Sequence, residues 1–470
     1  MSLQYRWLMV VTFEGERSDP TSIERPRARL PAPAPRPRVA DVLATLAGVG
    51  FGAIVALVIA GDSLGSLKSS GGWAIAFGRL SALSGAYLLL ILLVLISRIP
   101  WLERTVGQNQ LVRWHRSIGP WAIVLIALHI TSVTIGYSEV SHTSVVRQFA
   151  TFIAHYPDLL ASLVGFSLLV IAGVSSARIA RGRMRYETWW VIHLYMYVGI
   201  ALAFFHQIRV GVLFIADPLA RNVWITVWAA TALLIICCRV ALPVRANSRH
   251  HLRVQSVVKV APAVHTVVIR GRDLSDLAVA GGQFFQWRFL APGLWWHSHP
   301  YSLSALPQPP FLRLTVKGVG DQSRALAHLK PGTRVFMEGP YGAFTHHVRA
   351  HDHVTMIGAG VGVTPLRALL EDLPDSVQVN VIVRVSKLED VLHPEEFESL
   401  VARHHGKFHV LVGPRHEARF DARRLRQLVP DLIRSDVYVC GPPAFADHVV
   451  AMATKLGVSS DRIHREVFTF

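Results

Sequence analysis

Four histidines lie in two long apolar stretches of the chain. The first stretch contains His115 and His129, fourteen residues apart, and the second contains His193 and His206, thirteen residues apart. Each pair would span roughly 20 Å along a helix, about two thirds of the hydrocarbon core of a bilayer. Neutral imidazole binds iron well. Two such helices side by side could therefore hold two haems, one above the other across a membrane.

The alternative is that these histidines are structural. A single histidine in a soluble core usually only satisfies a hydrogen bond, but ionisable residues inside a membrane are costly and indicate function. Four of them at matched depth favour ligation. The spacing is imperfect, because fourteen residues return to within about 40° of the starting helix face and thirteen miss it by about 140°. The second helix would need local tightening, or a tilt, to direct both rings at one partner.

Composition favours a membrane protein of several domains. The chain has 470 residues, 51% of them hydrophobic and 17% charged, with a formal charge of +17. Arginines flank long apolar runs, and no basic helix interleaved with aromatic residues indicates nucleic-acid binding. The three cysteines (Cys237, Cys238 and Cys440) are too few for a disulfide framework.

Six apolar segments are each long enough to cross a bilayer. They cover residues 41–61, 74–97, 116–137, 157–177, 188–208 and 222–242. The N-terminal segment and the loops at 98–116 and 178–186 are rich in arginine, so both termini are predicted to be cytoplasmic in a plasma membrane protein. The third and fifth spans then run in the same direction. His115 lies level with His193 near the cytoplasm, and His129 with His206 near the outside.

The chain is predicted to have four parts. Residues 1–40 are rich in Pro and Arg and are typical of a disordered cytoplasmic tail, with a short surface helix as the alternative for Trp7–Phe13. The all-α bundle occupies 41–243. Alternating patterns at 250–346 predict an antiparallel β-barrel, and alternating strands and helices at 350–470 predict an α/β domain with a parallel sheet.

One glycine-rich motif and one basic pair in the last domain suit a nucleotide. GAGVGVTPLRALL follows an apolar strand and opens a helix, where backbone amides favour a pyrophosphate. Arg384 and Lys387 follow the next strand, where arginine would suit a ribose 2′-phosphate and favours NADPH over NADH. The neighbouring Glu389 and Asp390 argue against that preference.

Four shorter features leave alternatives open. In HPYSLSAL, Tyr301 could stack on a flavin and Ser302 could hydrogen-bond its reactive edge, or the segment could only begin a strand. GPYGAF could be only a turn. The terminal Phe468 and Phe470 could cover the flavin or pack as strand residues. Arg79, inside the second span, could reach lipid headgroups or pair with a haem propionate.

The order of these pieces resembles the ferric reductase and NADPH oxidase superfamily, in which a six-helix bis-haem domain is fused to a ferredoxin-NADP reductase-like module. The resemblance covers the chain from about residue 41 to its end. It rests on the two histidine pairs and on the motifs HPYSLSA, GPYGAF, GAGVGVTP, CGPP and the terminal EVF.

The resemblance implies a role for each matched residue. Four histidines would ligate two b-type haems: His115, His129, His193 and His206. An FAD site would comprise Gly282, Gln283, Phe284, Phe285, His299, Pro300, Tyr301, Ser302, Ser323, Gly339 and Gly342. A nicotinamide nucleotide site would comprise Gly358, Gly360, Gly362, Thr364, Pro365, Arg384, Cys440, Gly441 and Pro442. Phe468, or alternatively Phe470, would cover the flavin, and Arg79 would lie near the outer haem.

The sequence also departs from the family pattern. Val133 stands where eukaryotic oxidases often carry a further histidine, which speaks against an oxygen site of that kind. His299 stands where soluble reductases of this fold usually have arginine, which favours the transmembrane branch.

By this resemblance, electrons pass from NADPH through FAD and two haems to an acceptor outside, either a ferric chelate or dioxygen. Two alternatives remain: a module that delivers electrons to a partner protein, and a membrane-anchored flavin reductase without haem.

Overall fold

The computed structural model describes residues 9–14, 37–61, 64–156, 158–177, 180, 182–414 and 420–467. Contacts divide the chain into two compact units. A helical unit comprises Pro37–Leu102 and Asn109–Val240, and a reductase unit comprises the N-terminal segment, Glu103–Gln108 and Ala241–Phe470.

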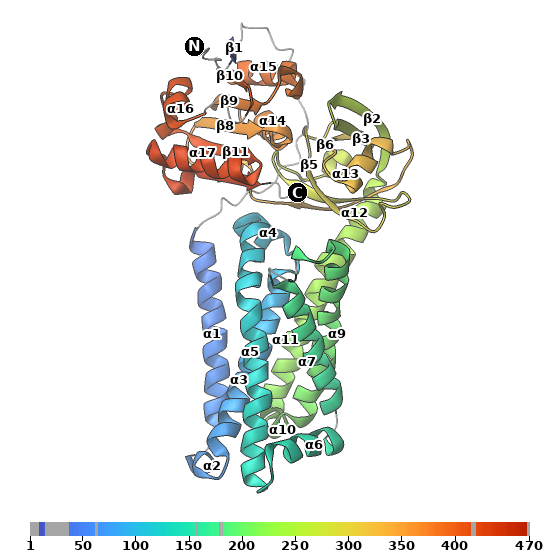
Figure 1. The fold of residues 1–470 in the computed structure, drawn as a ribbon, viewed down its shortest axis with the longest axis vertical. Coiled ribbons are helices and arrows are strands. Elements are labelled where there is room, and N and C mark those ends of the chain that lie inside the picture. Colours follow the sequence, from blue (N-terminus) through green and yellow to red (C-terminus); the bar gives the residue numbers. More distant parts are fainter. Residues whose placement is uncertain are drawn as a thin grey trace, which may run out of the picture. The chain divides into compact units, whose positions relative to one another are not determined.

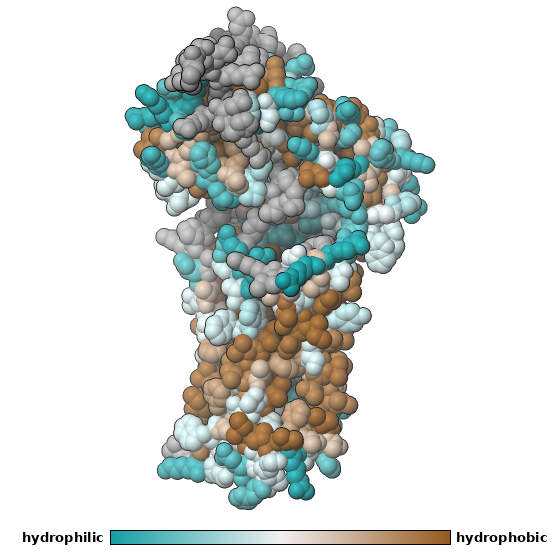
Figure 2. Space-filling model, viewed as in Figure 1, coloured by the Kyte–Doolittle hydropathy of each residue, from teal (hydrophilic) through white to brown (hydrophobic). Residues whose placement is uncertain are grey.

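The helical unit is a bundle of six long helices (Figure 1). Their bounds are α1 Pro37–Gly61, α3 Gly72–Leu95, α5 Gln108–Val140, α7 Leu159–Ser176, α9 Tyr186–Val210 and α11 Pro218–Ile236. Within the described residues, six helices are long and apolar enough to cross a membrane, as the sequence predicts. Figure 2 shows mostly hydrophobic residues over the middle of the bundle surface and hydrophilic residues toward its ends.

Shorter helices connect these spans. They are α2 Leu64–Lys68, α4 Pro100–Val106, α6 Val145–His155 and α10 Val212–Ala216. The sixth span continues through a π-helical turn, Cys237–Ala241, into α12, Leu242–His250.

Glycines let the helices of the bundle approach closely. A Cβ at Gly165 of α7 would lie 2.5 Å from the carbonyl oxygen of Gly199 on α9, and one at Gly199 would lie 2.7 Å from that of Gly165. In a lipid environment helix association depends on such packing, because burial from water no longer drives it. This contact fixes α9 against α7 between its two histidines.

The first part of the reductase unit is built from antiparallel strands, as predicted. Strands β2 (Arg253–Ala261), β3 (Val264–Arg270) and β6 (Phe311–Lys317) form one three-stranded sheet, in the order β2-β3-β6. Strands β5 (His299–Ser302), β4 (Phe284–Phe289) and β7 (Val335–Tyr341) form another, in the order β5-β4-β7. Alternate residues of β4 (Phe285, Trp287 and Phe289) are fully buried between them.

The second part contains the predicted parallel sheet, in the order β1-β10-β9-β8-β11-β12. Its parallel strands are β8 His353–Ala359, β9 Gln378–Val385, β10 Lys407–Val412, β11 Asp436–Gly441 and β12 Ile463–Val467. Its helices are α14 Val363–Asp372, α15 Pro394–Arg403, α16 Ala422–Leu428 and α17 Pro443–Lys455. The chain leaves β8 for β9 on one side and later returns to β11 on the other, which creates a crevice beyond the carboxyl ends of β8 and β11.

Strand β1 is the main departure from the sequence prediction. Met9–Glu14 pairs antiparallel with β10, with Met9 opposite Val412. The expected surface helix is therefore wrong for this segment, and so is disorder of these six residues. The backbone groups of β10 would otherwise form an unpaired sheet edge, and the added strand satisfies them. Residues 15–36 of the predicted tail lie outside the described residues.

Candidate functional site

The first histidine pair joins α5 to α9. The ring centres of His115 and His193 lie 6.2 Å apart, with an angle of 67° between their planes. A metal–imidazole bond is about 2 Å long, and adding roughly 1 Å from nitrogen to ring centre places two rings on opposite sides of one iron about 6 Å apart. At this separation His115 and His193 would be able to hold a single iron between them.

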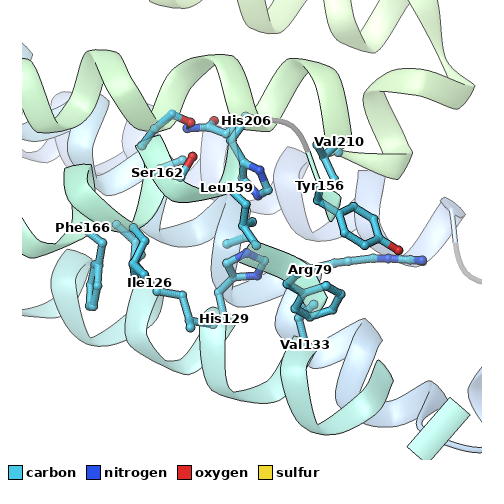
Figure 3. Close-up of a pocket in the computed structure, with 18 of the residues that line it drawn as sticks. Arg79, Ile126, His129, Val133, Tyr156, Leu159, Ser162, Phe166, His206 and Val210 are labelled. Atoms are coloured by element: carbon cyan, nitrogen blue, oxygen red, sulfur yellow. The ribbon is translucent and has the colours of Figure 1, made fainter. Parts of the chain in front are cut away.

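The second pair, His129 and His206, lines a cavity of about 260 Å³ in the helical unit. The two rings point toward one another from α5 and α9 (Figure 3). Arg79, Val133 and Tyr156 line the same cavity. The lining is almost entirely apolar apart from these two rings, Arg79 and a few hydroxyl and amide groups, which suits a large flat ligand with few polar atoms.

Hydrogen bonds from neighbouring helices hold three of the four rings by Nδ1. His115 Nδ1 lies 3.3 Å from the carbonyl oxygen of Leu92, and His129 Nδ1 lies 2.8 Å from that of Gly78, both on α3. His193 Nδ1 lies 3.3 Å from the hydroxyl of Ser176 on α7. A metal-binding histidine ordinarily donates one ring N–H in this way and presents the other nitrogen to the metal. In these three residues Nε2 is the nitrogen left for iron.

The fourth ring differs. Nδ1 of His206 is buried and has no hydrogen-bond partner among the described residues. Buried polar atoms are nearly always paired, so an unpaired one inside a cavity fits a site for a ligand or an ordered water. The two pairs would each supply two imidazoles to one iron, whose chemistry would be electron transfer.

The thirteen-residue spacing on α9 is not relieved by tightening of the helix. The helix is regular α-helix from Tyr186 to Val210, without a 3₁₀ or π turn. His193 instead contacts both Ser176 of α7 and His115 of α5, so its ring lies between two neighbouring helices.

The predicted flavin residues gather on β5. The hydroxyl of Ser302 is buried and has no partner among the described residues. Tyr301 stacks on His299 with ring centres 5.7 Å apart and planes 10° apart, and its carbonyl accepts a hydrogen bond of 2.9 Å from Trp287. Burial, followed by the neighbouring His297, lowers the pKa of His299 to about 4, so its ring is neutral at pH 7. An aromatic face beside an unpaired buried hydroxyl fits an isoalloxazine ring.

The loops around β5 are held by glycine and amide contacts. Gly282 has φ +92°, and a Cβ there would lie 2.0 Å from the carbonyl oxygen of Phe344. The side-chain amide of Gln283 donates to the carbonyl of Gly342 at 3.2 Å. Phe284 and Phe285 pair with Ser302 and Tyr301 across the sheet, while Pro300 and Gly339 lie in β5 and β7. Most of the predicted flavin residues are thus neighbours.

Ser323 stands apart from this group, in the short helix α13 (Asp321–Ala325). Its hydroxyl accepts from the backbone N–H groups of Val319 and Gly320 and donates to the carbonyl of Gly320. It therefore closes its own turn, and its predicted contact with FAD phosphates stays a prediction.

The two nucleotide motifs meet at the crevice beyond β8 and β11. The turn Gly360–Gly362 leads into α14, and a Cβ at Gly362 would lie 2.6 Å from the carbonyl oxygen of Cys440. Gly358, one residue before the end of β8, lies opposite Cys440. Thr364 and Pro365 are buried in the first turn of α14, and Gly441 and Pro442 lead from β11 into α17. The close approach at Gly362 requires glycine.

Glu466 is a residue of this site that the sequence prediction did not include. It lies beside Cys440 in the register of β12 on β11. Burial raises its pKa to about 7, and burial followed by Glu466 raises the pKa of the Cys440 thiol. The thiol is therefore protonated and is no nucleophile. The sequence contains a signal for this residue, because Glu466 is the glutamate of the terminal EVF motif. In that motif only Phe468 was predicted to have a role.

Arg384 is engaged differently from the prediction. Its guanidinium donates to the backbone carbonyls of Val385, Leu411, Gly413 and Pro414. These bonds tie together the ends of β9 and β10, so the structure adds no support for a 2′-phosphate contact. Phe468 and Phe470, the predicted flavin covers, lie outside the described residues.

Two families of known proteins match separate parts of the chain. Residues 81–204 match the family described as ferric reductase like transmembrane component, and residues 356–451 match the oxidoreductase NAD-binding domain. The first match contains His115, His129 and His193 and ends two residues before His206.

Individual relatives match less than half of the chain. An NADPH oxidoreductase of Mycobacterium tuberculosis is 29% identical over 40% of this chain and 51% of its own length. A flavohemoprotein of Vibrio cholerae is 31% identical over 36% of this chain and 45% of its own. The chain thus spans about half the length of the curated relatives it matches. The solved FAD/NAD-binding domain of a nitric oxide dioxygenase from Vibrio cholerae is 25% identical, covering 46% of this chain and 98% of that one, with a TM-score of 0.40.

Proposed function

We propose a path by which this chain transfers electrons across the membrane. The chain joins a ferric reductase-like transmembrane domain to an FAD- and NAD(P)H-binding oxidoreductase module. The chain is an integral membrane oxidoreductase that depends on NAD(P)H. In our proposal electrons leave NAD(P)H for FAD on the cytoplasmic side, cross the bundle at the His115–His193 pair and then the His129–His206 pair, and leave at the outer face. The arginine-rich loops support this orientation in the plasma membrane.

One observation carries the proposal: each pair brings two imidazoles from α5 and α9 to the same level, with the rings of the first pair 6.2 Å apart. Structural histidines would not need partners at matched depth. When bound, flavin would convert hydride transfer into single-electron transfer, and the haems would relay those electrons through the membrane.

The chain's own residues have three tasks. Backbone amides at the start of α14 and the glycines of its preceding turn receive a pyrophosphate. Tyr301 and Ser302 orient a flavin ring by stacking and hydrogen bonding. Cys440 and Glu466 shape the site where the nicotinamide meets it, as a protonated thiol and a carboxyl that titrates near neutral pH.

The acceptor that we propose is a small molecule at the outer face, either a ferric chelate or dioxygen. Each iron would have a histidine on both sides, so an acceptor would be reduced without binding to the metal. The apolar Val133 in the second cavity gives dioxygen no additional hydrogen-bond donor.

A reduced-minus-oxidised visible spectrum of the purified protein tests the haem path. We expect low-spin bis-histidine b-type bands and two haems per chain. A flavoprotein spectrum without those bands would contradict the path and favour a membrane-anchored flavin reductase.

Three assays separate the small-molecule acceptors, electron delivery to a partner protein, and the two possible electron donors. Reduction of a ferric chelate that persists without oxygen and with superoxide dismutase indicates direct ferric reduction, whereas its loss indicates superoxide formation. Turnover that appears only after a partner protein is added would indicate electron delivery instead. We propose NADPH as the donor, because a relative is named NADPH oxidoreductase, and a higher kcat/KM with NADH would overturn this choice.

A further inference from the structure

Ser176, at the end of α7, lies at the centre of three polar contacts. Its hydroxyl is 2.7 Å from the carbonyl oxygen of Ala172, 3.0 Å from Nε1 of Trp189 and 3.3 Å from Nδ1 of His193. The indole ring of Trp189 also stacks on the imidazole of His193, with centres 5.2 Å apart and planes 26° apart. No role for Ser176 or Trp189 follows from the motifs in the sequence.

The chemistry of these groups fixes where each proton lies. A serine hydroxyl has one proton to donate and two lone pairs, a carbonyl can only accept, and an indole N–H can only donate. The hydroxyl proton therefore goes to Ala172, and one lone pair accepts from Trp189. The remaining lone pair can only accept, so the proton on the imidazole of His193 must lie on Nδ1.

We infer that Ser176 is a positioning residue for the first haem: it sets the tautomer and ring orientation of His193 so that Nε2 faces the iron. This inference rests on the proposed haem path. Among the described residues, the Nδ1 of His193 is bound by a side chain, whereas His115 and His129 are held by backbone carbonyls. A donated Nδ1 hydrogen bond makes the imidazole a stronger ligand and favours the ferric state.

The decisive variant is Ser176→Ala, measured in the full-length protein in detergent. We expect haem at the first site to transfer to excess apomyoglobin about tenfold faster than in the wild type. We also expect the midpoint potential of that haem to rise, while the potential of the other haem stays unchanged. Ser176 is exposed, so its truncation leaves no cavity in the bundle.

Two matched variants make the result specific. Ser176→Thr keeps the hydroxyl and should restore the wild-type transfer rate and potential. Ser167→Ala removes another exposed hydroxyl of α7, which bonds only its own helix at Leu163, and should change neither quantity.

Three results would overturn the inference. They are equal haem transfer and equal potentials in Ser176→Ala and the wild type, the same change in Ser167→Ala, or no restoration by Ser176→Thr. A wild type without bis-histidine haem would instead refute the proposed haem path, so the two failures are distinguishable.

Discussion

The two histidine pairs lie on the same two helices but are supported differently. In the first pair both rings are held at Nδ1, His115 by the carbonyl of Leu92 and His193 by Ser176. In the second pair only His129 is held, by the carbonyl of Gly78, and Nδ1 of His206 has no partner among the described residues. The second pair also shares its cavity with the cation Arg79.

This difference predicts a direction for the proposed electron path. Held imidazoles are stronger ligands and favour ferric iron, whereas a nearby positive charge favours the more electron-rich ferrous form. The first site should therefore have the lower midpoint potential. Electrons that enter from the reductase unit would then move energetically downhill toward the second site.

Removing a ligand should have the largest effect. We expect His206→Ala to retain one haem per chain and to lower reduction of an outer acceptor by at least about 100-fold, because the second relay is lost. Reduction of flavin by NADPH should be unchanged. Haem-to-protein ratios and stopped-flow flavin spectra check both expectations, with His155→Ala, an exposed histidine of α6, as the control. Undiminished outer reduction would break the assignment of the second pair.

A smaller effect is expected in the wild type, where the midpoint potentials of the two haems should differ. One hydrogen bond and one screened charge are each worth about 1 kcal/mol, which together separate the two haems by roughly 90 mV. Spectroelectrochemical titration should show two one-electron steps. The lower step should be the one that survives in His206→Ala, and survival of the higher step would reverse the comparison.

Neutralising Arg79 should remove about half of that separation. In Arg79→Gln the second haem loses the charge that favours its ferrous form, so its potential should fall by about 40 mV. Arg79→Lys keeps the charge and should stay close to the wild type in the same titration. A fall confined to the first haem would show that Arg79 acts elsewhere.

Acid should change the stability of the reductase unit through two groups with opposite effects. The pKa of Glu466 is about 7 in the folded chain against an ordinary value of 4.5, so the folded state gains a proton first and is stabilised as pH falls through this range. The pKa of His299 is about 4 in the folded chain against 6.5, so the unfolded state gains a proton first and stability falls. Between pH 6.5 and 5 these two contributions oppose each other.

Glu466→Gln should therefore reveal the destabilising contribution of His299. Relative to the wild type, its free energy of unfolding should fall by up to about 1.4 kcal/mol per pH unit between pH 6.5 and 5. The temperature of flavin release, followed by fluorescence at several pH values, measures this slope. Parallel slopes for variant and wild type would contradict the raised pKa of Glu466.

The sequence by itself determined the spans and which of the four histidines lie together in pairs. Apolar length and arginine position depend on the surrounding membrane more than on tertiary contacts, so six helices and the parallel course of the third and fifth could be predicted. The alternation of strands and helices after residue 350 likewise predicted the parallel sheet, because local hydrophobic period reflects burial on one or both faces.

Only the tertiary structure decided what holds Nδ1 in three of the four rings, and hence that Nε2 is their free nitrogen. The partner of His193 is Ser176, seventeen residues away on another helix, and no local pattern marks that contact. The same holds for Met9–Glu14, whose place beside β10 depends on an edge formed some 400 residues later, and for Arg384, whose guanidinium is bound by carbonyls of β10 and the loop after it. Hydrogen bonds between distant segments depend on how helices and strands pack against one another. Helix length, the hydrophobic period of a strand and the presence of histidine depend on the local sequence alone.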